Sequence, residues 1–349
     1  MRSRRYLAPC VCGVLLLGAW GSAAEDPEAM KLAQEVGKKG WLVFSARTEK
    51  GDFDLFLSHP DGSGMRNITN NPQYDDYGAR FSPDGKRLLW RCLKKGTNVN
   101  HVDWGHQGTL VFANSDGSNP EEQGKEREYP WATWSPDALR IACLYKRESK
   151  IRIFELPAKT MQREFPNHDL FRQMQWSPNG ERFCGTATLA GAEWNIGALV
   201  LETGEFTHVS RGPSCTSDWF QGDPMSIVYS NGVGDDNDQG WTLLMQGRAD
   251  GSSRSLVYAE RKKHIYFGCT SPDDRYVIFS RRAHNNGAID GPMAIVRLAD
   301  TPIIAPEPFP PAEAKFPNAK RGPICYLDKL PNGFEPHWTY ADIGGPPAK

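Results

Sequence analysis

The chain has 349 residues, of which 41 are basic and 42 acidic, so its formal net charge at pH 7 is −1. This balance lacks the basic excess of a nucleic-acid-binding domain, and we expect no nucleic acid partner. No segment approaches the ~20 consecutive apolar residues that a membrane-spanning helix needs, so no membrane span is expected.

The first 24 residues have the three parts of a secretion signal. Arg2, Arg4 and Arg5 form a basic start, residues 11–19 an apolar stretch, and residues 22–24 a small-residue cleavage site. We therefore expect a signal peptide over residues 1–24 and a periplasmic or secreted mature protein, with 38 basic and 42 acidic side chains left.

Residues 25–39 predict a short N-terminal helix. Asp26 can cap it, Pro27 suits its first turn, and Gly37 can end it. Because Met30 and Val36 fall on one apolar face, we expect this helix to pack on the rim of the domain that follows.

A Ser-Pro-Asp-Gly tetrapeptide recurs from residue 82 onward. Its third position returns at spacings of 53, 42, 44 and 50 residues, in four clear copies and one degenerate copy: Ser82–Gly85, Ser135–Ala138, Ser177–Gly180, Gln221–Pro224 and Ser271–Asp274. Repeats of this period predict a circular or stacked repeat fold. Pro presets the first corner and Asp can bond the backbone two residues on, so each copy predicts a tight turn.

Each turn belongs to a larger repeating unit. An aromatic residue precedes the turn in most copies, a position that we call the aromatic slot, and an apolar strand follows. The slot residues are Phe81, Trp134 and Trp176, and near the degenerate copy Trp219 and Phe220 are both candidates. A second hairpin signal, Asp-Gly, follows a later strand in several units, at Asp61, Asp116 and Asp250. Each unit therefore predicts four antiparallel strands, which make one blade of a β-propeller.

The two ends of the chain complete the count of blades. Residues 41–46 look like a second strand without a first, and residues 336–342 look like a first strand without a second, with Trp338 in the aromatic slot. We expect an all-β, six-bladed propeller over residues 40–343, closed by N- and C-terminal strands that share one blade. Such closure removes free sheet edges. An open solenoid or two β-sandwiches are the alternatives.

A proline-rich segment at residues 302–323 interrupts the repeats. Such a composition favours extended polyproline geometry, so we expect it to cross the surface before the chain returns to close the ring. Residues 344–349 are expected to be a tail.

Six cysteines remain after the signal peptide. Three of them lie in or beside apolar strands and are expected to be small buried residues: Cys92, Cys143 and Cys184. Cys215 and Cys325 stand in matching Arg-Gly-Pro-x-Cys segments, which favours repeat similarity, with a disulfide as the alternative. No Cys-x-x-Cys motif occurs.

The turns, the aromatic slot and the Asp-Gly hairpins together resemble the TolB-type propeller repeats of exported bacterial proteins. Residues 61–69 followed by residues 81–86 are especially similar to that pattern. The resemblance covers about residues 40–300 and the closing strand, and it implies the propeller fold. TolB itself carries an α/β domain before its propeller, for which residues 25–39 are too short. The same repeats resemble those of oligogalacturonate lyases and of the propellers in front of some serine peptidases, so the fold does not choose a function.

Motifs for catalysis are missing from the sequence. There is no Gly-x-Ser-x-Gly nucleophile elbow and no phosphate-binding glycine loop, so we expect a non-catalytic protein without a cofactor. Two metal alternatives stay open. Residues 235–240 resemble the start of a calcium loop, and His168, His264 and His337 lead into first strands and suit manganese or zinc.

First strands line the central channel of a propeller, so polar residues on them are candidates for binding. We expect a binding rim at the channel mouth, chosen by position: Asp75, Asp76, Arg80, Glu128, His168, Asp169, Asp218, His264 and His337. Loops on a rigid scaffold commonly carry such a function. The sequence thus predicts a scaffold in the cell envelope that binds a protein or peptide, or an oligosaccharide. The alternative is a metal-dependent carbohydrate-active enzyme such as an oligogalacturonate-type lyase.

Overall fold

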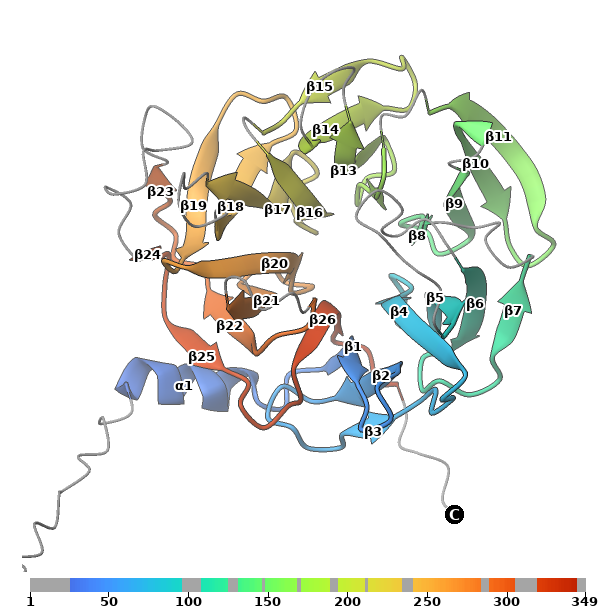
Figure 1. The fold of residues 1–349 in the computed structure, drawn as a ribbon. Helices are drawn as coiled ribbons and strands as arrows, with labels where there is room; N and C mark the ends of the chain where they lie inside the picture. Colours follow the sequence, from blue (N-terminus) through green and yellow to red (C-terminus); the bar gives the residue numbers. More distant parts are fainter. Residues whose placement is uncertain are drawn as a thin grey trace, which may run out of the picture.

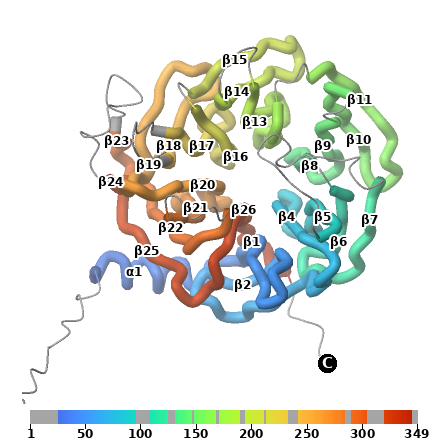
Figure 2. The backbone as a smooth tube through the Cα atoms, in the orientation of Figure 1, coloured from blue at the N-terminus to red at the C-terminus, as the bar shows by residue number. Residues whose placement is uncertain are grey.

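The computed structural model describes ten stretches of the chain: residues 26–95, 108–124, 131–145, 148–167, 171–188, 194–210, 213–233, 241–283, 289–304 and 319–343. Its strands form six antiparallel sheets arranged around a central axis (Figure 1). The chain passes once around this ring, and its first and last strands meet in one sector (Figure 2). The predicted six-bladed β-propeller is confirmed, and the open solenoid and the two sandwiches are excluded.

The first three blades are built from the following strands, in order from the channel outward. Blade 1 consists of β26 (Gly333–Thr339), β1 (Trp41–Arg47), β2 (Phe53–Ser58) and β3 (Arg66–Asn67). Blade 2 consists of β4 (Tyr74–Phe81), β5 (Arg87–Lys94), β6 (Thr109–Asn114) and β7 (Glu121–Gln123). Blade 3 consists of β8 (Trp131–Trp134), β9 (Arg140–Tyr145), β10 (Lys150–Glu155) and β11 (Thr160–Pro166).

The second half of the ring repeats this arrangement. Blade 4 consists of β12 (Gln175–Trp176), β13 (Arg182–Thr188), β14 (Trp194–Val200) and β15 (Phe206–His208). Blade 5 consists of β16 (Ser214–Trp219), β17 (Ser226–Val233), β18 (Trp241–Arg248) and β19 (Arg254–Ala259). Blade 6 consists of β20 (Lys263–Thr270), β21 (Tyr276–Ala283), β22 (Met293–Arg297) and β25 (Ile324–Tyr326).

The proline-rich region contributes two further strands that the four-strand unit does not anticipate. β23 (Ile303–Ile304) and β24 (Ala319–Lys320) both pair with the outer edge of β19, so the sheet of blade 5 has six strands. This long outer edge is thereby covered, which protects it from pairing with another chain. The centre of the proline-rich segment, the expected signal peptide and the expected tail lie outside the described residues.

The closure of the ring is the predicted one. β26 pairs antiparallel with β1, so that Leu42 stands opposite Trp338 and Val43 opposite His337. The C-terminal strand thus supplies the first strand of blade 1, and the N-terminal region supplies the other three.

The repeated turn explains why Ser opens the tetrapeptide. In blade 2 the Ser82 hydroxyl donates to Asp84 Oδ1 (2.6 Å) and accepts from the Arg87 N–H (3.0 Å). The blade 6 copy does the same from Ser271, which donates to Asp273 (2.7 Å) and accepts from Tyr276 (3.1 Å). The serine hydroxyl therefore links the aspartate of the turn to the first residue of the second strand, which stabilises the hairpin.

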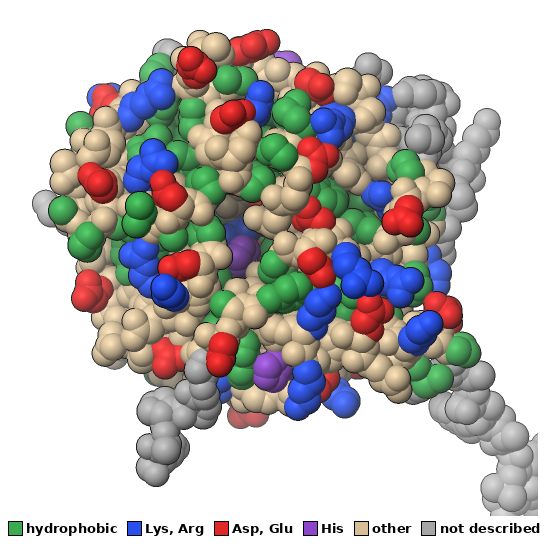
Figure 3. Space-filling model, turned by 180° about the vertical axis from the view of Figure 1, so that it is seen from behind, with side chains coloured by type: hydrophobic (Ala, Val, Ile, Leu, Met, Phe, Trp, Pro, Cys, Tyr) green, Lys and Arg blue, Asp and Glu red, His purple; other side chains and the backbone are tan. Residues whose placement is uncertain are grey.

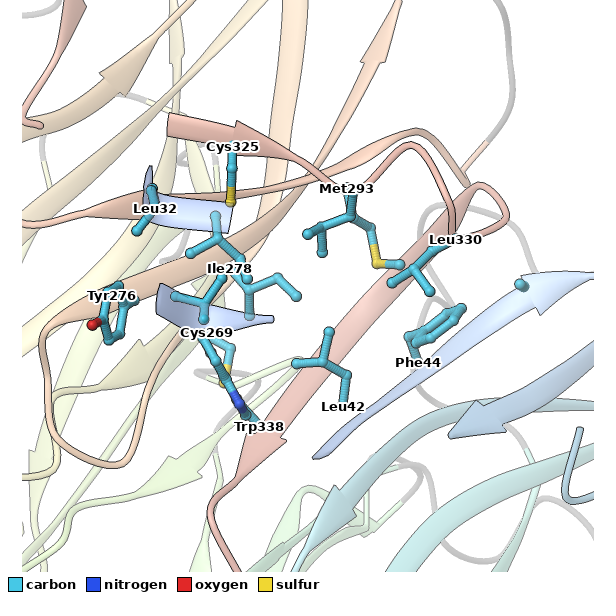
Figure 4. Close-up of a cluster of buried hydrophobic side chains, with 14 residues drawn as sticks. Leu32, Leu42, Phe44, Cys269, Tyr276, Ile278, Met293, Cys325, Leu330 and Trp338 are labelled. Carbon is cyan, nitrogen blue, oxygen red and sulfur yellow. The ribbon is translucent and has the colours of Figure 1, made fainter. Parts of the chain in front are cut away.

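Apolar clusters fill the spaces between neighbouring blades. At the closure, side chains of blades 1 and 6 pack together with the helix α1 (Pro27–Val36), as Figure 4 shows for Leu42, Ile278 and Trp338. Leu32 and Val36 of α1 are each 1 % exposed, so the helix seals the outer side of this joint. In the described part of the chain, no helix is long and apolar enough to cross a membrane.

All six cysteines that follow the expected signal peptide are described, and all are free thiols: Cys92, Cys143, Cys184, Cys215, Cys269 and Cys325. Cys215 lies on β16 and Cys325 on β25, in different blades. The disulfide alternative is therefore excluded, and the expected repeat similarity is also wrong, because β16 is the innermost strand of blade 5 whereas β25 is the outermost strand of blade 6.

Candidate functional site

One side chain from each blade points to the channel from the same place on the innermost strand. We call these six residues the channel ring: Arg80, Thr133, Gln175, Asp218, Cys269 and His337. Each pairs with the second strand of its own blade and directly precedes the residue in the slot position, which is aromatic except in blade 6, where it is Thr270. Five of these side chains line the cavity at the channel mouth, and the Cys269 sulfur lies within 4.8 Å of side-chain atoms of Asp218 and His337.

A β-bulge in the innermost strand sets the direction of four of these side chains. The pairing register shifts just before Arg80, Asp218, Cys269 and His337. In each case the residue two positions earlier has a positive φ: these residues are Gly78 (62°), Thr216 (51°), Phe267 (58°) and Glu335 (50°). Bulges commonly redirect a side chain next to a functional site, and three of these four carry non-glycine residues in a sparsely populated conformation.

Arg80 spans the channel. Its Nη1 lies 2.5 Å from Oδ2 of Asp218, although Arg80 belongs to blade 2 and Asp218 to blade 5, the opposite blade of six. Burial alone would lower the pKa of Arg80, but the neighbouring Asp218 carboxylate more than offsets this and raises it. The charges of the two side chains cancel, and together they form the floor of the channel mouth.

Two uncharged ring residues support the guanidinium. With its amide oxygen turned toward Arg80, Gln175 accepts from Nε (3.2 Å) and Nη2 (3.0 Å) of Arg80 and donates to Thr133 Oγ1 (3.0 Å). This orientation satisfies both ends of the amide. Thr133 Oγ1 also accepts from the Trp176 N–H (3.2 Å). Arg80 is therefore held at three nitrogen atoms and cannot rotate freely.

The remaining ring residues are neutral. Nδ1 of His337 accepts from the Phe81 N–H (3.2 Å), so a neutral imidazole carries its proton on Nε2. Burial and the Arg80 charge lower the pKa of His337 to about 3, which keeps the ring neutral across the physiological range. Burial, together with the nearby Asp218 carboxylate, raises the pKa of the Cys269 thiol, so this sulfur is not an activated nucleophile.

Asp218, Cys269 and His337 also have the residue types of a metal site. One ligand atom from each lies within 4.8 Å of the other two. However, Asp218 already accepts from Arg80 and from the Trp219 N–H (2.9 Å), and the His337 nitrogen free of the backbone carries the proton. A cation at this point would also lie beside the Arg80 guanidinium. The arrangement therefore fits a hydrogen-bonded cluster and does not fit a bound metal.

A cavity of about 350 Å³ lies above the ring, on the side of the Ser-Pro turns. All ring side chains except that of Cys269 form its floor. Aromatic and turn residues form a collar around it: Phe81, Pro83, Trp134, Trp176, Pro272, Trp338 and Tyr340. Figure 3 shows a hollow at the centre of the molecule, with a histidine visible at its bottom. This is the mouth of the channel, closed below by the Arg80–Asp218 pair.

The structure brings together three of the predicted rim residues, Arg80, Asp218 and His337. Asp75 and Asp76 lie at the opposite end of β4, where Asp75 accepts from the Phe53 N–H (2.9 Å) and Asp76 accepts from Trp90 Nε1 (2.8 Å).

The other predicted residues are not at this mouth or cannot be placed. His264, at the start of β20, stacks on Tyr266 with ring centroids 5.7 Å apart. Glu128, His168 and Asp169 lie outside the described residues, as does the candidate calcium loop at 235–240.

Sequence reasoning misses three ring residues: Thr133, Gln175 and Cys269. Their common signal is the position directly before the aromatic slot in each repeat. A search for charged or imidazole side chains passes over them, because all three are uncharged.

Comparison with known proteins supports the fold. No known family's sequence profile matches the chain, and no curated protein matches it in sequence. Among solved structures it is similar to TolB from Acinetobacter baumannii, with a TM-score of 0.60, 12 % identity and coverage of 86 % of this chain and 67 % of that one.

A second TolB-type structure is also similar. A putative TolB from Agrobacterium tumefaciens has a TM-score of 0.51 and 18 % identity, over 85 % of this chain and 90 % of that one. A chain from a nidogen/laminin complex has a TM-score of 0.53 and 9 % identity, over 82 % of this chain and 98 % of that one. The chain has a TolB-like propeller fold. At these identities the likeness shows the fold alone.

Proposed function

We propose that this protein is an exported, non-catalytic propeller that binds a segment of another protein at the mouth above the channel ring. The cavity of about 350 Å³ carries this proposal, because it combines a polar floor with an aromatic collar on rigid strands. Concave sites lined by apolar side chains with a few converging polar groups are the usual form of a binding site.

The chemistry of the ring favours binding over catalysis. A general base needs a pKa near the working pH, whereas the pKa of His337 is about 3. A thiol nucleophile must form a thiolate, whereas burial raises the pKa of Cys269. These residues therefore offer neither a base nor a nucleophile at neutral pH, and no observation favours the lyase alternative.

Two observations support the location and the type of partner. Residues 1–24 have the pattern of a secretion signal, and two of the similar structures are TolB proteins. The similarity to a chain of a nidogen/laminin complex adds an example of this architecture in a protein–protein assembly.

The test is site-specific photo-crosslinking of the mature protein in the producing cell's envelope. A photoreactive amino acid replaces Gln221, an exposed residue on the edge of the cavity, and in a control it replaces Met161, which is 53 % exposed on the outer strand β11. We expect one reproducible protein adduct from the Gln221 position, persisting in chelator, and none from the Met161 position. No adduct at either position, or the same adducts at both, would refute binding at the mouth.

A further inference from the structure

The channel ring decides how a polypeptide can occupy the mouth. Arg80 reaches Asp218 on the opposite blade, and Gln175 accepts from Nε and Nη2 of its guanidinium. The side chains of Arg80 and Asp218 are only 17 % and 9 % exposed. A bound segment therefore cannot thread through the channel as long as this pair is intact, and it must either end in the cavity or turn back out.

The floor of the cavity has more hydrogen-bond donors than acceptors. Three of the five N–H groups of Arg80 are engaged, by Gln175 and Asp218, which leaves two. His337 has its proton on Nε2, because Nδ1 accepts from the backbone. Thr133 Oγ1 accepts two hydrogen bonds and retains its own proton to donate.

The acceptors of the floor are already in use. Oδ1 of Asp218 accepts from the Trp219 N–H and Oδ2 accepts from Arg80. A positively charged chain start would meet the Arg80 guanidinium and unused donors, whereas a carboxylate would meet partners for both oxygens. Hydrogen bonds between a guanidinium and a carboxylate are among the strongest that proteins make.

We infer that the mouth recognises the free C-terminal carboxylate of its partner, with Arg80, His337 and Thr133 as donors. This inference rests on the proposed function. The collar contacts the last side chains of the partner, and its exposed prolines, Pro83 and Pro272, together with the half-buried Tyr340, favour apolar residues there. Capture of a chain end by converging donors is a general mode of peptide recognition.

The experiment compares two forms of one probe on the intact mature protein. A synthetic heptapeptide library with its last four positions randomised is made with free carboxylates and, in a matched set, with C-terminal amides. We expect enrichment only from the free-carboxylate set, with apolar final residues, and at least about a tenfold loss of affinity when a selected peptide is amidated.

The outcomes separate the inference from the proposed function. Equal enrichment from both sets would overturn carboxylate recognition and leave peptide binding intact. No enrichment from either set, in a protein that also gives no envelope adduct at Gln221, would overturn both.

Two variants locate the effect. The double variant Arg80→Gln with Asp218→Asn removes both charges together and so leaves no buried charge unpaired. It should bind the free and amidated forms of a selected peptide equally. The single variant Thr133→Val, which keeps the ion pair, should lower only the affinity for the free carboxylate. Unchanged discrimination in both variants would place the recognition elsewhere and refute the assignment.

Discussion

A buried ion pair below the channel ring ties the closing strand to blade 2. Arg91 Nη2 on β5 lies 2.9 and 2.7 Å from the two carboxylate oxygens of Glu335 on β26, and the side chains are only 7 % and 3 % exposed. The Arg91 guanidinium also lies 4.6 Å above the Trp131 ring of blade 3. The Arg91 side chain therefore connects blades 1, 2 and 3 through two interactions, next to the point where the ring closes.

Removing one member of this pair should destabilise the protein strongly, because the other charge would stay buried without a partner. We expect Glu335→Gln or Arg91→Met to lower the free energy of unfolding by about 4 kcal/mol. For a domain of about 300 residues that corresponds to a fall in Tm of roughly 6 °C. The double variant should lose less than either single variant, since it leaves no unpaired charge, so the coupling between the two positions should be at least ~4 kcal/mol.

Urea unfolding followed by tryptophan fluorescence, together with calorimetry, measures all four proteins of this cycle. Far-ultraviolet circular dichroism establishes that each variant keeps its β structure. Single variants within about 1 kcal/mol of the wild type would refute the reasoning. So would a double variant whose loss equals the sum of the two single losses, because that would show no coupling between Arg91 and Glu335.

Three further predictions follow from buried positions. Burial raises the pKa of Asp76 to about 7, so its neutral form stabilises the fold below about pH 4 and this contribution is lost as the pH rises through 7. Between pH 5 and pH 8, the free energy of unfolding measured in urea should fall for the wild type but not for Asp76→Asn. An equal fall in both proteins would contradict this prediction. Gly78→Ala should lower the free energy of unfolding by at least ~2 kcal/mol, because φ is 62° and the added Cβ would lie 2.7 Å from both Arg91 Nη2 and Glu335 Oε2. An unchanged free energy of unfolding in the same urea assay would contradict this. Leu32→Ala should lower the free energy of unfolding by ~2–4 kcal/mol, because it opens a cavity under α1. A loss of only a few tenths of a kcal/mol, measured by calorimetry, would show that α1 does not stabilise the packing between blades 1 and 6.

The repeats made the fold predictable because each copy has one local chemistry. A serine hydroxyl, a proline and a carboxylate form the same hairpin wherever they recur, and the aromatic slot before it must be buried between blades. The shared blade was predictable from Trp338, which repeats the slot at the far end of the chain. The two strands added to blade 5 were not, because β23 and β24 are two residues long and have no periodicity of their own.

The candidate site was only partly predictable, for a geometric reason. Asp75 and Arg80 are on the same strand, but five residues of strand extend by ~17 Å, which places them at opposite ends of the channel. The sequence does not show how far along the channel a residue lies until the strand register is known. Gln175 is missed by a search for charged side chains, because its importance lies in the orientation of Arg80 and not in a charge of its own.

Fold and recognition are encoded at adjacent residues that are under different constraints. The slot residue must fill the space between two blades, and Trp134, Trp176 and Trp219 do so with similar rings. The residue before it lines the cavity at the channel mouth in five of the six blades, and each of the six blades has a different side chain at this position. Since the Arg80–Asp218 pair is neutral overall, the selectivity of the ring has to come from the number and direction of unused hydrogen-bond donors. A change in the end group that is recognised would then require substitutions in the ring alone, whereas a change in the preferred last side chains would require substitutions in the collar.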